Sequence, residues 1–133
     1  MTGDRPSSGF VARVRALCLG LPEAHEEHAW VGIRWRIRDR TFGHVLTIAD
    51  GWPPAYAHAA GTEGPCQVLM FRSAGPELDA LRHAGPPFFP TPWRHDEVGV
   101  HLTRDTDWTE VAELLTASYR VQAPKRLAAR LGR

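Results

Sequence analysis

The first predicted element is a helix near the start of the chain. Ser7 and Ser8 offer side-chain oxygens that can cap a helix start. Gly20 and Pro22 favour a helix end. Between them, apolar residues recur at the three- and four-residue spacing of a single helix face: Phe10, Val11, Val14, Leu17, Cys18 and Leu21.

A hairpin is predicted next, because residues 33–38 read IRWRIR and alternate strictly between apolar and basic side chains. This period of two is typical of a half-buried strand. The two isoleucines and the tryptophan are expected to face the core, and the arginines are expected to face away from it. Asp39 and Arg40 form the expected turn, and residues 41–48 form the expected returning strand.

The middle of the chain predicts a loop, two strands and a stiff connection. Residues 50–65 are dense in glycine and proline, which indicates a long loop. Strands are expected at residues 66–71 and 98–102. The segment 86–92 holds four prolines and cannot supply the amide donors of a central strand, so we expect it to be an extended edge segment.

Further helices are expected to begin at Pro76, Asp107 and Pro124. The resulting order is helix, hairpin, strand, helix, strand pair and helices. This order is typical of an α+β fold with two layers, in which helices pack mainly on one face of an antiparallel sheet. Residues 1–133 are expected to form a single domain.

The composition agrees with a folded protein of a reducing compartment. Apolar residues make up 43% of the chain, which includes five tryptophans. The two cysteines, Cys18 and Cys66, give no indication of a disulfide framework. The N-terminal residues lack the apolar segment of a signal peptide, and no run approaches the ~20 apolar residues of a membrane span. We therefore expect a cytoplasmic location without a membrane partner.

The net charge is only +1, but the basic residues are unevenly distributed. Residues 34–40 hold four arginines and one aspartate, and residues 119–133 hold five basic residues and no acidic one. Such surfaces can contact phosphates without reading bases. The plainer interpretation is a solvated strand face. The candidate nucleic-acid contacts are Arg34, Arg36, Arg38, Arg40, Arg94, Lys125 and Arg126.

Aromatic and histidine side chains cluster in or beside the expected loops. Aromatic walls with a few polar groups suit a small planar ligand. Core packing is the alternative for about half of them. The candidate ligand-binding residues are Trp30, His44, Trp52, Phe88, Phe89, Trp93 and His95.

No motif indicates catalysis, a metal or a cofactor. Residues 25–28 read HEEH, with the histidines three apart rather than four as in HExxH, and a third zinc ligand is not evident. We interpret this segment as solvated and acidic. Residues 94–97 read RHDE, but neighbours on an extended chain diverge and no nucleophile lies near them in sequence. The glycines at residues 61 and 64 lack the lysine of a phosphate-binding loop. We expect a protein that is not an enzyme and uses no cofactor.

Residues 16–23 read ALCLGLPE and residues 35–42 read WRIRDRTF. With several later segments, they make the chain resemble the MmcQ/YjbR-like family from about residue 8 to about residue 131. No single motif is strong, but their order and spacing are fairly specific. The segment around Cys18 and Pro22 is close to the Cys-x-x-x-Pro-Gly opening of that family. The other matching segments are 35–42, 98–100, 107–115, 117–120 and 123–127.

This resemblance implies a two-layer α/β fold and a pair of hairpin wings that are commonly described as DNA-binding. Some members lie in antibiotic biosynthesis or resistance gene clusters, so the resemblance is also compatible with drug binding. Glu97 stands where many relatives carry tryptophan, and a carboxylate there disfavours DNA phosphates. The leading hypothesis is a non-enzymatic protein that binds double-stranded DNA through its basic hairpin and C-terminal helix. The alternative is binding of a small aromatic drug or metabolite by a sequestration or resistance protein. A monomer or a weak dimer is expected.

Overall fold

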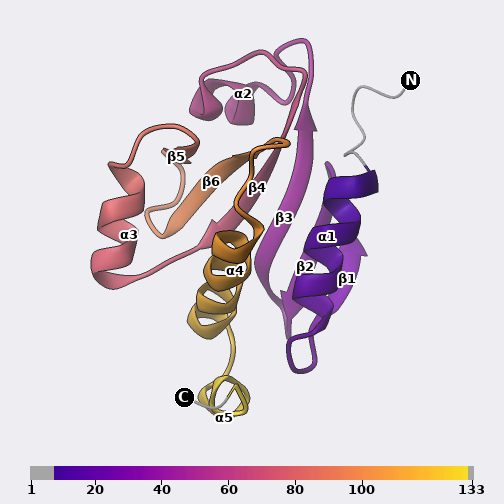
Figure 1. Ribbon diagram of the computed structural model, residues 1–133, viewed down its shortest axis with the longest axis vertical. Helices are drawn as coiled ribbons and strands as arrows, with labels where there is room; N and C mark the ends of the chain where they lie inside the picture. Colours follow the sequence, from indigo (N-terminus) through magenta and orange to yellow (C-terminus); the bar gives the residue numbers. More distant parts are fainter. Residues whose placement is uncertain (1–7, 132–133) are drawn as a thin grey trace.

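The computed structural model describes residues 8–131, which form one six-stranded antiparallel sheet with helices on both faces (Figure 1). The strand order is β1-β2-β3-β4-β6-β5, and every pairing is antiparallel. The strands are β1 (His25–His28), β2 (Ile33–Ile37), β3 (Arg40–Ile48), β4 (Cys66–Arg72), β5 (Phe88–Pro90) and β6 (Glu97–Leu102).

Most helices pack on one face of the sheet, here called the helix face. Residues of α1, α3, α4 and α5 share one buried cluster with the strands, whereas α2 packs on the opposite face, here called the α2 face. The helices are α1 (Ser8–Leu19), α2 (Pro54–Ala60), α3 (Gly75–Arg82), α4 (Trp108–Gln122) and α5 (Lys125–Ala129). The predicted α+β class, with helices mainly on one face, is confirmed. None of the described helices combines the length and the apolar character needed to cross a membrane.

The helix face is built around Trp35 of β2, whose side chain is fully buried. Gly43 lies directly across from it on β3, and a side chain there would approach Cys18 of α1 and Leu115 of α4. The glycine therefore lets both helices pack close to the indole. The indole nitrogen donates a hydrogen bond of 2.8 Å to Glu26 on β1, so its polar group is satisfied.

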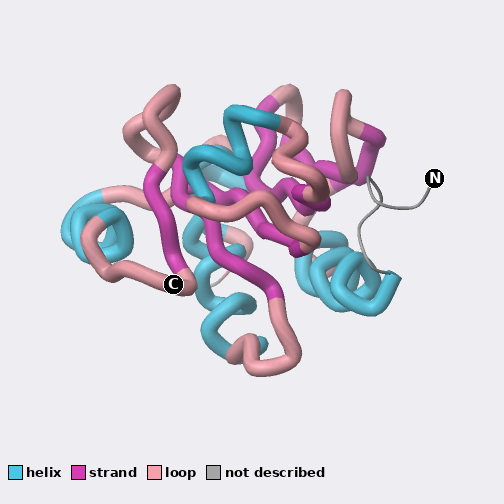
Figure 2. Tube along the Cα trace, turned by 90° about the horizontal axis from the view of Figure 1, so that it is seen from above, coloured by secondary structure: helices cyan, strands magenta, loops and turns pink. Residues whose placement is uncertain are grey.

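The α2 face carries a smaller apolar cluster. Its members are Val31, Leu46, Ile48, Ala57, Val68, Met70 and Phe89. The ring of Phe89 lies directly on Gly99, where an added Cβ would be 2.2 Å from a ring carbon. Because α2 spans only seven residues, it covers part of this face and leaves the rest uncovered. Figure 2 shows α2 above the strands and the longer helices below them.

Residues 25–28 are largely exposed, as predicted for a solvated acidic segment, and they form the edge strand β1 through antiparallel pairing with β2. Two local predictions need correction. The predicted loop over residues 50–65 contains α2, since Pro54 starts a helix and Gly61 ends it in the left-handed conformation at φ 71°. The hairpin turn lies at Arg38 and Asp39, with Arg38 at φ 57°, and Arg40 already belongs to β3.

Several other predictions are confirmed. The Asp107 side chain caps α4 by accepting a hydrogen bond from the Glu110 amide. The helix expected from Pro76 is α3, and the one expected from Pro124 is α5. The proline-rich connection supplies the short edge strand β5.

Ser118 of α4 joins the ends of β3 and β4. Its hydroxyl accepts from the Arg72 amide at 2.8 Å and donates to the Phe42 carbonyl at 2.6 Å. The serine is fully buried, so these backbone groups have no access to water through it. One side chain therefore provides a hydrogen-bond partner for a backbone group of each strand at the point where both strands reach α4.

We predict that Ser118→Ala destabilises the protein by about 1–3 kcal/mol, because it leaves a buried amide and a buried carbonyl without partners. The free energy of urea unfolding measures this loss. Thr116→Ala is the control: this hydroxyl bonds only the Ala112 carbonyl of its own helix, and its removal should stay within about 0.5 kcal/mol. Equal effects of the two substitutions would contradict the proposed link.

Candidate ligand-binding pocket

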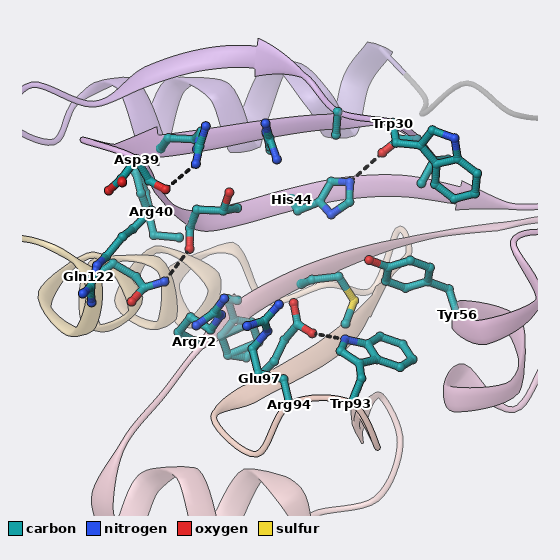
Figure 3. Close-up of a pocket in the computed structure, with 18 residues that line it drawn as sticks. Trp30, Asp39, Arg40, His44, Tyr56, Arg72, Trp93, Arg94, Glu97 and Gln122 are labelled. Carbon is teal, nitrogen blue, oxygen red and sulfur yellow. Dashed lines mark hydrogen bonds between the residues drawn. The ribbon is translucent and has the colours of Figure 1, made fainter.

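The uncovered part of the α2 face forms a half-open pocket of about 520 Å³ (Figure 3). Its floor comes from β2, β3, β4 and β6, and its walls come from α2 and the segment between β5 and β6. The lining residues are Ala29, Trp30, Val31, Arg34, Arg36, Asp39, Arg40, Thr41, Phe42, His44, Tyr56, Met70, Phe71, Arg72, Trp93, Arg94, Glu97 and Gln122.

The strand register explains why charged side chains reach this pocket. Trp35 points to the helix face, so its neighbours Arg34 and Arg36 must point to the α2 face. Arg34 lies opposite Glu27 on β1 and opposite His44 on β3. A row of polar side chains therefore crosses the strands beside the apolar cluster under α2.

The arginines of β2 are held by carboxylates. Glu27 accepts hydrogen bonds from both Arg34 and Arg36, and Arg36 also donates to the Asp39 carbonyl. The guanidinium of Arg34 is the main cause that lowers the pKa of Glu27. Arg36 Nε is buried and has no hydrogen-bond partner among the described residues. The β2 arginines therefore line the pocket as partly neutralised groups with one unsatisfied donor.

The other arginines of the pocket differ in their pairing. Arg72 of β4 contacts both carboxylate oxygens of Asp96, at 3.3 and 3.4 Å. Arg40 and Arg94 are exposed, and neither forms an ion pair within the part of the chain that the structure describes. These two guanidinium groups retain their full capacity to bind an anion.

Three aromatic side chains that line the pocket, Trp30, Tyr56 and Trp93, are here called the aromatic wall. The Tyr56 ring meets Trp93 edge to face, with centroids 5.1 Å apart, and meets His44 edge to face at 6.2 Å. Trp30 is 82% exposed and packs against Trp52, with ring centroids 5.5 Å apart. The exposed indole of Trp30 therefore has an open face at the rim of the pocket.

His44 is held in one orientation and one tautomer. Its Nε2 lies 2.6 Å from the Val31 carbonyl, which only a protonated nitrogen can approach as a donor. Burial is the main cause that lowers the pKa of His44, and the nearby charge of Arg34 lowers it further. The ring is therefore neutral near pH 7, and its Nδ1 carries a lone pair that can accept a hydrogen bond.

The structure brings the two predicted sets of site residues partly together. Four candidate nucleic-acid contacts and three candidate ligand residues line this one pocket: Arg34, Arg36, Arg40, Arg94, Trp30, His44 and Trp93. Two further candidates lie close by, because Trp52 stacks on Trp30 and His95 follows Arg94 without lining the pocket.

The remaining candidates lie elsewhere. Phe88 packs against the cluster of the helix face, and Phe89 is buried on Gly99. Arg38 forms a 3.6 Å ion pair with Glu23 outside the pocket. Lys125 and Arg126 are exposed on α5. They do not line this pocket.

Sequence reasoning did not select several lining residues, including Arg72, Tyr56 and Glu97. Arg72 ends an apolar strand and carries no pattern of its own. Tyr56 belongs to the helix that was expected to be a loop. The described residues contain no group of three histidine, cysteine, aspartate or glutamate side chains that could hold a metal ion.

Comparison with known proteins identifies the family. The sequence profile of the YjbR family matches residues 19–121, so the chain belongs to that family. The search of curated proteins found no match.

Two crystal structures share the fold. One is a protein from Pseudomonas syringae, with 15% identity and a TM-score of 0.61 over 88% of this chain and 98% of that one. The other is protein DR2400 from Deinococcus radiodurans, described with a DUF419 domain, with 21% identity and a TM-score of 0.59 over 84% and 76% of the two chains. These likenesses show the fold.

We predict that His44 makes the fold less stable as the pH falls from about 7.5 to about 5. The pKa of His44 is lowered in the folded state, so the unfolded chain binds more protons below its own pKa of about 6.5. Urea unfolding at both pH values measures the loss. His44→Gln should remove this part of the dependence, and His58→Gln, on the exposed side of α2, should retain it. An unchanged pH dependence in His44→Gln would contradict the assignment.

Proposed function

We propose that this YjbR family member is a non-enzymatic binding protein whose pocket takes a small anion that carries an aromatic ring. The observation that supports this most strongly is the convergence of five arginines on one half-open pocket. Only two carboxylate side chains, Asp39 and Glu97, line the same pocket among the described residues. An anion would meet charge-assisted donors from several strands at once.

The unpaired arginines give the pocket its anion-binding capacity. Arg40 reaches it from the start of β3, and Arg94 reaches it from the segment before β6. Figure 3 shows Arg40 and Arg72 at the end of the pocket away from Trp30 and Tyr56, and Arg94 in the middle, between Glu97 and Trp93. An incoming carboxylate or phosphate would accept hydrogen bonds there without first displacing a protein carboxylate from either unpaired group.

The aromatic wall supports a ring as the second part of the ligand. Trp93 and Tyr56 are already fixed edge to face, and Trp30 presents an exposed indole at the rim. A volume of about 520 Å³ falls within the usual ~300–1,000 Å³ of small-molecule sites. The pocket is therefore large enough for a two-ring compound with an anionic group.

A binding role also fits the chemistry of the lining. No serine or cysteine is among the described residues that line the pocket. The Nε2 proton of His44 is engaged by the Val31 carbonyl, which leaves the ring as a fixed acceptor beside Arg34. We therefore propose recognition rather than covalent chemistry at this site.

The alternative hypothesis, DNA binding, has less support in the charge arrangement. Arg34 and Arg36 share Glu27, and Arg38 pairs with Glu23. A duplex laid along this hairpin would bring its phosphates near those carboxylates, which costs affinity. The exposed Lys125 and Arg126 belong to a five-residue helix and offer few contacts.

We predict that 2-naphthyl phosphate binds the protein and that 2-naphthol binds at least about tenfold more weakly, which corresponds to ~1.4 kcal/mol. The reason is that only the phosphate can accept from the guanidinium groups. The double substitution Arg40→Gln and Arg94→Gln should also weaken phosphate binding at least about tenfold, since each charged hydrogen bond contributes ~1.5–3 kcal/mol. Isothermal titration calorimetry measures both differences.

Arg126→Gln is the matched control and should bind 2-naphthyl phosphate like the unmodified protein. Equal binding of the phosphate and the alcohol, or no binding of either, would overturn the proposal. A parallel titration with duplex DNA at two salt concentrations tests the alternative. DNA binding would be favoured if the affinity for the duplex falls as salt rises, and if Arg126→Gln weakens that affinity while the pocket substitutions leave it unchanged.

A further inference from the structure

We propose that the ligand of this pocket is an aromatic acid that also carries a hydrogen-bond donor, a hydroxyl or an amino group, on its ring. This inference rests on the proposed function and narrows its ligand class. It comes from two hydrogen-bond acceptors of the pocket lining that have no protein donor among the described residues, Nδ1 of His44 and Oε2 of Glu97. The acid group of the ligand is assigned to Arg40 and Arg94, because a guanidinium supplies donors and no acceptor.

His44 presents the first acceptor. Its Nε2 proton is used by the Val31 carbonyl at 2.6 Å, so Nδ1 is the nitrogen left for a ligand. Figure 3 shows one ring nitrogen of His44 turned to that carbonyl and the other turned away from it, into the pocket. The edge-to-face contact with Tyr56 at 6.2 Å restricts the ring, so the acceptor has a fixed direction.

Glu97 of β6, opposite Arg72 of β4, supplies a second acceptor. Its Oε1 accepts from Trp93 Nε1 at 2.7 Å and from the Thr91 hydroxyl at 3.4 Å. Its Oε2 has no hydrogen bond within the described part of the chain. The indole N–H of Trp93 is thereby used as well. The Tyr56 hydroxyl and the Trp30 indole N–H are the aromatic donors of the pocket without a protein partner among the described residues.

A ligand that lies against His44 and Glu97 must therefore supply hydrogen-bond donors to these acceptors. A bare ring would remove water from His44 Nδ1 and from the free oxygen of Glu97 without replacing its hydrogen bonds, which carries a desolvation cost. A second anionic group would face the Glu97 carboxylate. A hydroxyl or amino group on the ring satisfies one or both acceptors, while the acid group of the same molecule stays with the arginines.

The experiment compares naphthoates that differ in one substituent. The probes are 2-naphthoate, the 1-, 3- and 6-hydroxy-2-naphthoates and the corresponding methoxy compounds, measured by isothermal titration calorimetry. A methoxy group keeps the acceptor oxygen and loses the donor. We expect at least one hydroxy compound to bind at least about tenfold more tightly than its methoxy partner and than 2-naphthoate.

Substitutions of the two acceptor residues show which of them causes the tighter binding of the hydroxy compound. His44→Phe keeps an aromatic ring against Tyr56 and removes Nδ1, and Glu97→Gln replaces the carboxylate with an amide. The hydroxy compound should lose its advantage over 2-naphthoate, taken as the ratio of the two affinities within each variant, in at least one of them. His95→Phe, a neighbouring histidine that does not line the pocket, is the control and should retain the full advantage. Circular dichroism and urea unfolding check that each variant is folded.

The outcomes separate this inference from the proposed function. If the parent naphthoate binds and the arginine substitutions weaken it, but no hydroxy compound exceeds its methoxy partner, the donor requirement is wrong and the anion pocket stands. A hydroxyl advantage that survives in both His44→Phe and Glu97→Gln also overturns the inference. If neither 2-naphthoate nor 2-naphthyl phosphate binds, the proposed function and this inference fail together.

Discussion

Burial of the Trp35 indole between the sheet and the helices determines which side chains of β2 reach the pocket. Successive side chains of a strand point to opposite faces, and a slip of one residue would exchange the two sets. With Trp35 on the helix face and Gly43 opposite it, Arg34 and Arg36 are placed on the α2 face. The same alternation separates neighbouring glutamates of β1: Glu26 bonds the indole, and Glu27 bonds the β2 arginines.

The short α2 leaves a pocket open on that face. It covers the apolar rows around Leu46 and Val68 and ends where the polar row of Arg34 and His44 begins. A longer helix would have needed apolar residues beneath it. Tyr56, at the boundary, belongs to both regions: it packs on the apolar cluster and contacts His44 and Trp93 in the pocket. The pocket thus follows from incomplete coverage of one sheet face.

Local patterns were enough to predict the fold class and most elements. The alternation in residues 33–37 and the capping side chain of Asp107 each rest on neighbours in sequence, and both appear as expected. Two elements were missed for different reasons. The segment HEEH has no apolar alternation and becomes strand β1 by pairing with β2, and the prolines and glycines that delimit α2 were interpreted as parts of a loop.

The candidate site was harder to predict because its parts come from distant segments. The sequence indicated basic residues and aromatic residues as two separate sets, and only the sheet order places Arg40, Trp93 and Arg94 around one pocket. Ion pairs between side chains also cannot be read from a sequence. The four arginines of residues 34–40 look equivalent, yet Arg34 and Arg36 are held by Glu27 and Arg40 has no ion pair within residues 8–131.

The most direct test of the account observes the guanidinium groups themselves. Two-dimensional ¹H–¹⁵N spectra of the arginine Nε–H groups would be recorded while 2-naphthyl phosphate is added. The account predicts that the signals of Arg36, Arg40 and Arg94 shift together with one saturation curve, and that the signal of Arg126 remains in place. Equal shifts at Arg126, or no shift at the pocket arginines, would contradict the claim that this face of the sheet is an anion-binding site.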